Sequence, residues 1–261
     1  MIVKNKFGRL LSDIQSWKEG FIEVATNKEH WKDGYSAYSL ADFMLYQKGE
    51  NWLKEHVKSL INVTKVEFDY AEIEHASSFD SYNGSRKQDL AIWGRTEKGT
   101  IYIAIEAKVL ESFDVTIEEA YNHAKEYLRK TNPRSKKVVR IEELVSHFYP
   151  SCTPDCAEIS NLRYQLFHYV WSSLNEGENF SESKKSFKNR KHADFVFTPV
   201  LSFKTSHSLE DDPQGIIQNE NKMDFIRFCS GPKYQAVREK TYSFTEGNQT
   251  LISSYNEISL L

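Results

Sequence analysis

The chain has 261 residues, of which 39% are hydrophobic and 27% charged, with a formal net charge of −3. This composition predicts a folded protein with a full hydrophobic core, and the charge does not indicate a polyanion partner. No segment is apolar for long enough to span a membrane, the first residues lack the apolar run of a secretory signal, and the odd number of cysteines, 3, argues against a disulfide scaffold. We therefore expect a cytoplasmic protein that does not associate with membranes.

The first third of the chain has a helical pattern. Apolar residues recur at helical spacing over 37–44, with Ser36 as the expected N-cap, and the pattern continues over 52–61. Residues 63–71 then alternate between apolar and charged side chains, which predicts a half-buried strand. Residues 77–87 are rich in Ser, Asp, Asn and Gly and predict a loop.

Two short apolar runs follow, over residues 89–93 and 101–109. The residues between them, 94–100, predict a turn with Gly99 as its breaker, so the two runs should form an antiparallel pair. Residues 101–105 are apolar on both faces, which predicts a central strand in which charged side chains need a reason.

Charged residues stand at the ends of this pair. Glu106 and Lys108 are two residues apart on a strand, so they should project from the same face, while Ala107 points the other way. Asp89 begins the first run and should lie near the end of the second run, beside Glu106. The pattern predicts two carboxylates and an ammonium that meet at the rim of a sheet.

The rest of the chain alternates helices and strands. Residue 199 is a proline inside a predicted strand, which suggests an edge strand or a bulge. The predicted elements are a helix over 116–130, a helix over 158–174, a strand over 194–203, a loop over 214–221, a short helix over 222–229 and a hairpin over 240–254. The order of elements favours the α/β class, with a mixed central sheet flanked by helices on both faces.

One domain spanning residues 1–261 is the expected organisation. It comprises an N-terminal helical segment (1–62), a core (63–203) and a C-terminal extension (204–261). Basic residues are concentrated over 125–140 and over 184–192. Such runs form either solvated faces or a local positive surface for nucleic acid, and the sequence leaves both interpretations open.

The residues at the strand ends have the chemistry of a divalent-metal site. Asp89 and Glu106 would supply hard oxygen ligands, and the backbone carbonyl of Ala107 would be a third. Lys108 would orient or deprotonate an attacking water, with its pKa lowered by the neighbouring cation. The alternative is that these are ordinary solvent-facing residues at the end of a strand.

A zinc site is a separate alternative. Cys152 and Cys156 have His147 and His168 nearby in sequence, but the Cys-x3-Cys spacing is wider than the usual knuckle and no second cysteine pair follows. The carboxylate site is therefore the stronger prediction.

The order of Asp89, the strand Ile-Ala-Ile-Glu106-Ala-Lys108 and a following helix resembles the PD-(D/E)XK nuclease superfamily. The segments 31–38, 105–113 and 162–168 resemble an uncharacterised, stand-alone bacterial branch of it. The resemblance implies a restriction-endonuclease-like core and Mg²⁺-dependent hydrolysis, with Mn²⁺ able to substitute. It also implies metal ligation by Asp89 and Glu106, with Lys108 in the water-activating position.

The resemblance also directs attention to residues outside the strand pair. Gln88 stands where the superfamily motif has a proline, a tolerated departure. Many members add a glutamate from an earlier helix, where this chain offers only Asp42, so Glu74 is the substitute we weigh.

Residues 163–168 carry further candidates. Arg163 falls in the apolar arc of the helix expected over 158–174, so its guanidinium must find either a buried carboxylate or a substrate phosphate. Gln165 and His168 fall on the other side of that helix, where ordinary surface residues are expected. The resemblance alone adds Gln165 to the predicted catalytic set.

The leading hypothesis is a Mg²⁺-dependent endonuclease acting on DNA rather than RNA, in a restriction or phage-defence role. A homodimer would allow paired cuts on both strands. The second hypothesis is a non-catalytic nucleic-acid-binding or interaction module that retains a nuclease fold. A third is an α/β protein whose charged strand end serves a different metal-dependent hydrolysis.

Overall fold

The strand pair that carries the charged residues forms the centre of the fold. A computed structural model of the chain describes residues 1–78, 82, 85–178 and 192–261. In it, β3 (Arg86–Thr96) pairs antiparallel with β4 (Gly99–Lys108), which confirms the predicted hairpin. The turn is tighter than the predicted 94–100, because Thr96 already pairs with Gly99 and Gly94 lies inside β3.

A mixed sheet of eight strands extends from this hairpin in both directions, in the order β1-β2-β3-β4-β5-β8-β7-β6. The strands β1–β2, β4–β5 and β5–β8 pair parallel, and the other neighbours pair antiparallel. The remaining strands are β1 (Ile2–Lys4), β2 (Val66–Ser77), β5 (Phe195–Lys204), β6 (Gln235–Arg238), β7 (Thr241–Glu246) and β8 (Gln249–Ser259). All three predicted segments of the chain therefore contribute strands to one sheet.

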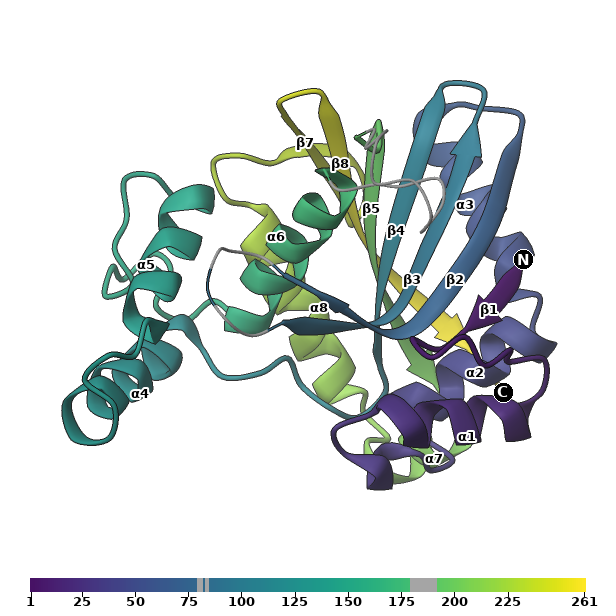
Figure 1. The fold of residues 1–261 in the computed structure, drawn as a ribbon, viewed down its shortest axis with the longest axis horizontal. Coiled ribbons are helices and arrows are strands. Elements are labelled where there is room, and N and C mark those ends of the chain that lie inside the picture. The colour runs from purple at the N-terminus through teal and green to yellow at the C-terminus, as the bar shows by residue number, and fades with distance from the viewer. Residues whose placement is uncertain (79–81, 83–84, 179–191) are drawn as a thin grey trace.

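Helices cover both faces of the sheet, which confirms the predicted α/β class (Figure 1). One face is covered by helices from the N-terminal part: α1 (Ile14–Val24), α2 (Ser36–Tyr46) and α3 (Gly49–Ile61), with the short 3-10 turn η1 (Lys28–His30). The other face packs against α6 (Tyr164–Glu178) and α8 (Ile216–Cys229), while α5 (Lys137–Phe148) packs on α6 and α4 (Ile117–Lys130) packs on α5. A short helix, α7 (Ser206–Asp211), follows β5.

Several predicted boundaries are wrong. The N-cap of α2 is Tyr35, and Ser36 is already helical. The helix expected over 158–174 begins only at Tyr164, because the chain turns repeatedly through the preceding residues. Helix α8 includes most of the predicted loop over 214–221, and α5 was not predicted. The predicted start of α4 is confirmed, with Thr116 and Glu119 forming a capping box.

The proline in β5 is accommodated in the middle of the sheet, so the prediction of an edge strand is wrong. Strand β5 pairs with β4 on one side and with β8 on the other. Proline has no amide donor, and the paired positions of β4 and β5 are interrupted between Phe197 and Val200. The Tyr169 hydroxyl of α6 fills this interruption, donating to the carbonyls of Ala104 at 2.6 Å and Pro199 at 3.2 Å.

Candidate functional site

Three carboxylates lie in one row across neighbouring strands. The register pairs Ile73 of β2 with Leu90 of β3, and Leu90 with Ile105 of β4. An acid stands one residue beyond each of these paired positions: Glu74 follows Ile73 on β2, Asp89 precedes Leu90 on β3, and Glu106 follows Ile105 on β4. The sheet therefore aligns these acids, which are far apart in the sequence, and the same register gives Glu74 a structural reason to belong to the site.

Asp89 is anchored to the strand that carries the other two predicted residues. Its Oδ2 accepts a hydrogen bond of 2.7 Å from the backbone amide of Ala107. Because the amide and the carbonyl of one strand residue face the same side, the Ala107 carbonyl also faces Asp89. Part of Asp89 reaches the surface while its carboxyl group is enclosed.

Glu106 and Lys108 form an ion pair within the protein interior. Lys108 Nζ lies 2.8 Å from Glu106 Oε1, and only 7% and 6% of these side chains are exposed. Gln165 of α6 joins them, donating to Glu106 Oε1 at 2.6 Å and accepting from Lys108 Nζ at 3.3 Å. The surface position expected for Gln165 is wrong, because the first turn of α6 lies beside the end of β4, where Glu106 and Lys108 project.

The charges of the row act on one another. Burial raises the pKa of the Asp89 carboxyl well above its ordinary value, and the Glu106 and Glu74 carboxylates raise it further, against Lys108 and the Ala107 amide. Burial raises the pKa of Glu74 as well, with Lys87 opposing it and Glu106 adding to it. The row thus accumulates negative charge that favours a bound proton or cation.

The predicted lowering of the Lys108 pKa concerned a site that holds a cation, and the protein groups alone shift this pKa in the other direction. Burial alone lowers the pKa of Lys108, but the carboxylates of Glu106 and Asp89 raise it by more, so the net shift is upward. In this state Lys108 is an ammonium that can balance negative charge and cannot accept a proton.

Glu74 occupies an unusual backbone position. Its φ of 50° lies in the left-handed region, which a non-glycine residue rarely adopts and which costs conformational free energy. Glu74 Oε2 contacts Lys87 Nζ at 3.4 Å, and Lys87 also donates to the Val24 carbonyl at the end of α1. Near this position the ends of β2 and β3 turn toward α6 (Figure 1).

A small cavity borders the row on the side of the N-terminal helices. Glu74 and Asp89 line it together with apolar side chains of α1, α2 and the segment between them, including Trp31. Asp42, the other acid that the sequence offered, does not line this cavity. Burial raises its pKa, and the carboxylate that adds to this rise is Asp33, which is not a member of the row. The helix acid is therefore outside the row.

Arg163 does not lie on a helix, so the helical-wheel argument for it is wrong. It precedes α6, and its Nε donates to Asp224 Oδ2 of α8 at 2.7 Å. Of the two partners that the sequence left open, the structure provides the carboxylate. Arg163 reaches the acid row only indirectly: its Nη1 lies 3.5 Å from the carbonyl of Asp114, whose amide donates to Gln165.

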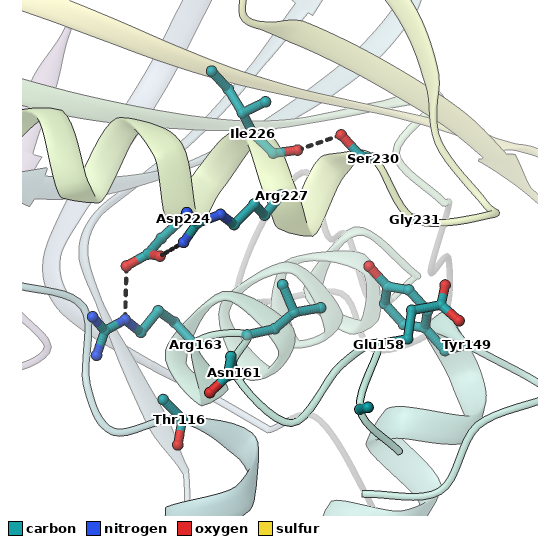
Figure 2. Close-up of a pocket in the computed structure, with 12 residues that line it drawn as sticks. Thr116, Tyr149, Glu158, Asn161, Arg163, Asp224, Ile226, Arg227, Ser230 and Gly231 are labelled. Atoms are coloured by element: carbon teal, nitrogen blue, oxygen red, sulfur yellow. Dashed lines mark hydrogen bonds and ion pairs between the residues drawn. The ribbon is translucent and has the colours of Figure 1, made fainter. Parts of the chain in front are cut away.

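Arg163 and Asp224 also border a larger pocket, of about 740 Å³, between the start of α6 and α8. Figure 2 shows Arg227 reaching the same Asp224 carboxylate from α8, and Glu158 beside Tyr149 on the far side of the pocket. None of the three acids of the row lines this pocket, which is therefore a separate feature.

The remaining candidates from the sequence are His168 and the two basic runs. His168, expected at the surface, is a buried residue of α6, and burial and Arg86 lower its pKa well below the ordinary value. The basic run over 125–140 lies on α4, α5 and their connection, at one end of the molecule (Figure 1). The second run, over 184–192, falls outside the described residues except for His192.

The predicted zinc alternative has a different ligand set from the one the sequence suggested. Cys152 and Cys156 do lie together, with 3.3 Å between their sulfur atoms, but their third neighbour is Glu158. His147 instead lies 3.1 Å from Lys233 Nζ, and His168 packs against Tyr164.

Two features of the structure, one at the acid row and one outside it, were not predicted from the sequence. The supporting hydroxyl of Tyr169 was missed, although a proline in a buried strand leaves an acceptor on the neighbouring strand that needs a donor. The cluster of Cys152, Cys156 and Glu158 was missed because only histidines were weighed as partners of the cysteines, whereas the carboxylate two residues after Cys156 was the available signal.

Comparisons with known proteins give one match. A family model described as a domain of unknown function (DUF6946) matches residues 11–246 of the chain. No curated protein and no solved structure matches. Among the described residues, none of the helices has the length and apolar character that crossing a membrane requires.

Proposed function

Because this chain belongs to the DUF6946 family, whose description assigns no activity, we propose its function from the site: a metal-dependent nuclease that hydrolyses phosphodiester bonds of DNA. The observation that carries the proposal is the row of Glu74, Asp89 and Glu106 with Lys108 paired to its last member. Ordinary sheet proteins avoid aligned, enclosed carboxylates because each charge must be compensated.

The chemistry of the donor set fits Mg²⁺. Carboxylate oxygens of Asp89 and Glu106 and the carbonyl of Ala107 are hard ligands of the kind that Mg²⁺ and Mn²⁺ prefer, and Glu74 adds charge to the same row. A divalent ion held there would supply Lewis-acid polarisation of a substrate phosphate. Burial is the main cause of the raised pKa values of Asp89 and Glu74, and the Glu106 carboxylate adds to both, so a bound cation would offset the same negative charge.

The chain's own residues would divide the remaining work. Lys108, as an ammonium, would offset the negative charge that develops on the phosphate and hold a water by hydrogen bonding. Gln165 would fix the positions of Glu106 and Lys108, since it bonds to both. Arg163, paired with Asp224, would support the segment that presents Gln165 rather than contact the reacting atoms.

The substrate class rests on the resemblance to PD-(D/E)XK nucleases and on the basic run over 125–140. Part of that run is neutralised within the protein, since Lys125 pairs with Asp155 and Lys130 with Glu126. A restriction or phage-defence role and a homodimer belong to the same proposal and depend on the same test.

Purified protein should cut plasmid or single-stranded DNA in the presence of Mg²⁺ or Mn²⁺, and chelation should stop it. The variants D89N and K108M should each lower the rate by at least about 100-fold, since they remove groups that act on the transition state. D42N is the matched control, because this acid lies outside the row. Cutting that persists in both D89N and K108M would sink the assignment.

One observation favours a second candidate, a nucleic-acid-binding or interaction module without catalysis. The Glu106–Lys108 pair is almost fully buried and satisfied by Gln165, so it stabilises the fold without any substrate. This candidate predicts DNA binding that weakens with salt, is unchanged by chelation and is accompanied by no cleavage.

A further inference from the structure

A second cluster of ligand-type side chains lies outside the carboxylate row, in the segment that joins α5 to α6. Cys152, Cys156 and Glu158 are the only group of three or more Cys, His, Asp or Glu residues in the described parts of the chain whose ligand atoms all lie within 4.8 Å of one another. The two sulfur atoms are 3.3 Å apart, and Cys152 Sγ lies 3.7 Å from Glu158 Oε2.

We propose that Cys152, Cys156 and Glu158 bind one thiophilic divalent cation of the Zn²⁺ class, with solvent as the fourth ligand. Tetrahedral bond lengths of about 2.3 Å to sulfur and about 2.0 Å to oxygen place two sulfurs about 3.8 Å apart and sulfur about 3.5 Å from oxygen. The observed separations of 3.3 Å between the sulfurs and 3.7 Å from Cys152 Sγ to Glu158 Oε2 differ from these by about 0.5 Å and about 0.2 Å, which are shifts that side-chain rotation can supply.

The local backbone holds the three ligands ready. The amide of Cys156 donates to the Thr153 carbonyl at 2.9 Å, which folds the residues between the cysteines into a turn. The Cys156 carbonyl then accepts from Ile159 and Ser160, and this second turn brings Glu158 back over the sulfurs. Because Ile159 is fully buried, the segment is fixed to the core at its centre.

The surroundings allow a cation to enter. Both cysteines are half-buried and Glu158 is exposed, so the ligand atoms are accessible from solvent. Glu158 also lines the pocket of Figure 2, with Tyr149 beside it and Arg163 across the pocket. Asp155, which lies between the two cysteines in the chain, pairs with Lys125 at 3.3 Å, so that lysine has its own carboxylate partner.

Binding exchanges protons for the metal. The hydrogen bond from Cys156, with burial and the Glu158 carboxylate, raises the pKa of the Cys152 thiol to about 11, so Cys152 carries its proton before binding. Two thiols and one aqueous cation give a dithiolate complex and release two protons, with no change in oxidation state. Thiolate ligands select Zn²⁺, Cd²⁺ or Co²⁺ over Mg²⁺, so this site and the carboxylate row take different ions.

The test is metal binding by the full, reduced chain, with Zn²⁺ and Co²⁺ as the probes. We expect one Zn²⁺ per chain, thiolate-to-Co²⁺ charge-transfer absorption, and no competition from millimolar Mg²⁺. The C152S/C156S variant should bind Zn²⁺ at least about 100-fold more weakly and E158Q about tenfold more weakly, since even loss of an outer-shell partner costs 10–100-fold. The C229A variant removes the remaining cysteine, which is buried in α8, and should bind as the parent does.

A measurement on the unaltered chain guards against variants that fail to fold. Zn²⁺ should protect Cys152 and Cys156 from alkylation, and their modification should be complete without it. Unchanged Zn²⁺ affinity in C152S/C156S, or alkylation that proceeds equally with and without Zn²⁺, would overturn the proposal. So would a parent chain that binds no Zn²⁺ and only forms a Cys152–Cys156 disulfide in air, which would identify a redox pair instead.

Discussion

The acid row and the thiol cluster balance their charges in opposite ways. In the row, the sheet aligns carboxylates from three strands, and the fold supplies its own cation, the ammonium of Lys108, 2.8 Å from Glu106. In the cluster, a single short segment brings together Cys152, Cys156 and Glu158, and the Cys152 thiol remains neutral by keeping its proton. Internal compensation allows Glu106 and Lys108 to lie buried in the core, whereas the two cysteines of the cluster stay half-exposed.

Because of this difference, the two regions should affect the stability of the fold in different ways. A carboxylate that is enclosed with its counter-ion contributes to folding only as long as the pair is intact, because either partner alone is a buried charge. A dithiol costs the fold little without metal, since neutral thiols behave as small apolar groups. Variants in the row should therefore change stability most, and variants in the cluster should change stability only when Zn²⁺ is present.

Replacing Lys108 should lower the stability of the fold more than any other change in the row. The K108M variant keeps the length of the side chain but leaves Glu106 enclosed without its cation. We expect a loss of about 3 to 5 kcal/mol in the free energy of unfolding, measured by urea denaturation. Millimolar Mg²⁺ should recover part of that loss if the row binds the ion, because the ion would replace the ammonium.

The E106Q/K108M double variant provides the control for that prediction. It removes both charges, so its stability should lie well above that of K108M alone. Equal stability of the single and the double variant would show that the Glu106–Lys108 charges are not coupled.

Gln165 tests whether the row depends on α6. The Q165L variant removes the hydrogen bonds to Glu106 and Lys108, and bonds to charged groups contribute about 1.5 to 3 kcal/mol each. Because Gln165 is only half-buried, we expect a loss of about 2 kcal/mol in a thermal or urea unfolding experiment. Q15L is a matched control, since Gln15 makes a similar bond to Glu19 at the exposed surface of α1, and its loss should be below about 0.5 kcal/mol.

Tyr169 tests the support beneath the row. The Y169F variant removes the donor to the carbonyls of Pro199 in β5 and of Ala104, which lies two residues before Glu106 in β4. We expect a loss of about 1 to 2 kcal/mol in the free energy of unfolding, measured by urea denaturation. Replacing Pro199 by alanine restores a backbone amide at the interruption, so Y169F/P199A should be more stable than the sum of the single changes predicts. Additive effects would contradict the assigned role of the hydroxyl, and Y127F, at an exposed tyrosine of α4, should be neutral.

The sequence carried much of this architecture, for reasons visible in particular residues. The β-branched run over 101–105 predicted a buried central strand, and Gly247 with Asn248 predicted the hairpin of β7 and β8, which the structure confirms. The acids in the first turn of the helix expected over 116–130, and the basic residues in its last turn, predicted α4, and the structure adds a capping box at Thr116. Local signals of this kind depend on neighbours in the chain, which a single sequence displays.

What could not be predicted depended on long-range packing. The start of α6 at Tyr164 follows from turns after Cys156, and the bond from Gln165 to Glu106 follows from the packing of α6 on β4. The position of Glu74 opposite Asp89 required the register of β2 on β3, which the sequence pattern does not fix. The partner of Arg163, Asp224, lies 61 residues away and was similarly out of reach.

The smallest expected effect concerns acid sensitivity, which should arise outside both regions. His56 of α3 stacks on Trp52 and contacts the Ser254 hydroxyl at 3.1 Å. Burial, aided by Arg238, lowers its pKa from 6.5 to about 4. Since the folded-state pKa is below the unfolded value, the contribution of His56 to stability is full above pH 6.5 and is lost as the pH falls toward 4.

Replacing His56 should therefore flatten the pH dependence of stability in that range. The H56Q variant should lose about 1 kcal/mol less than the parent between pH 7 and pH 5, measured by urea unfolding at each pH. H207Q removes an exposed imidazole and controls for the loss of a histidine as such. If H56Q retains the full acid sensitivity of the parent, the titrating groups lie elsewhere, and the enclosed carboxylates of the row become the first to examine, because their charge balance would then depend on pH as well.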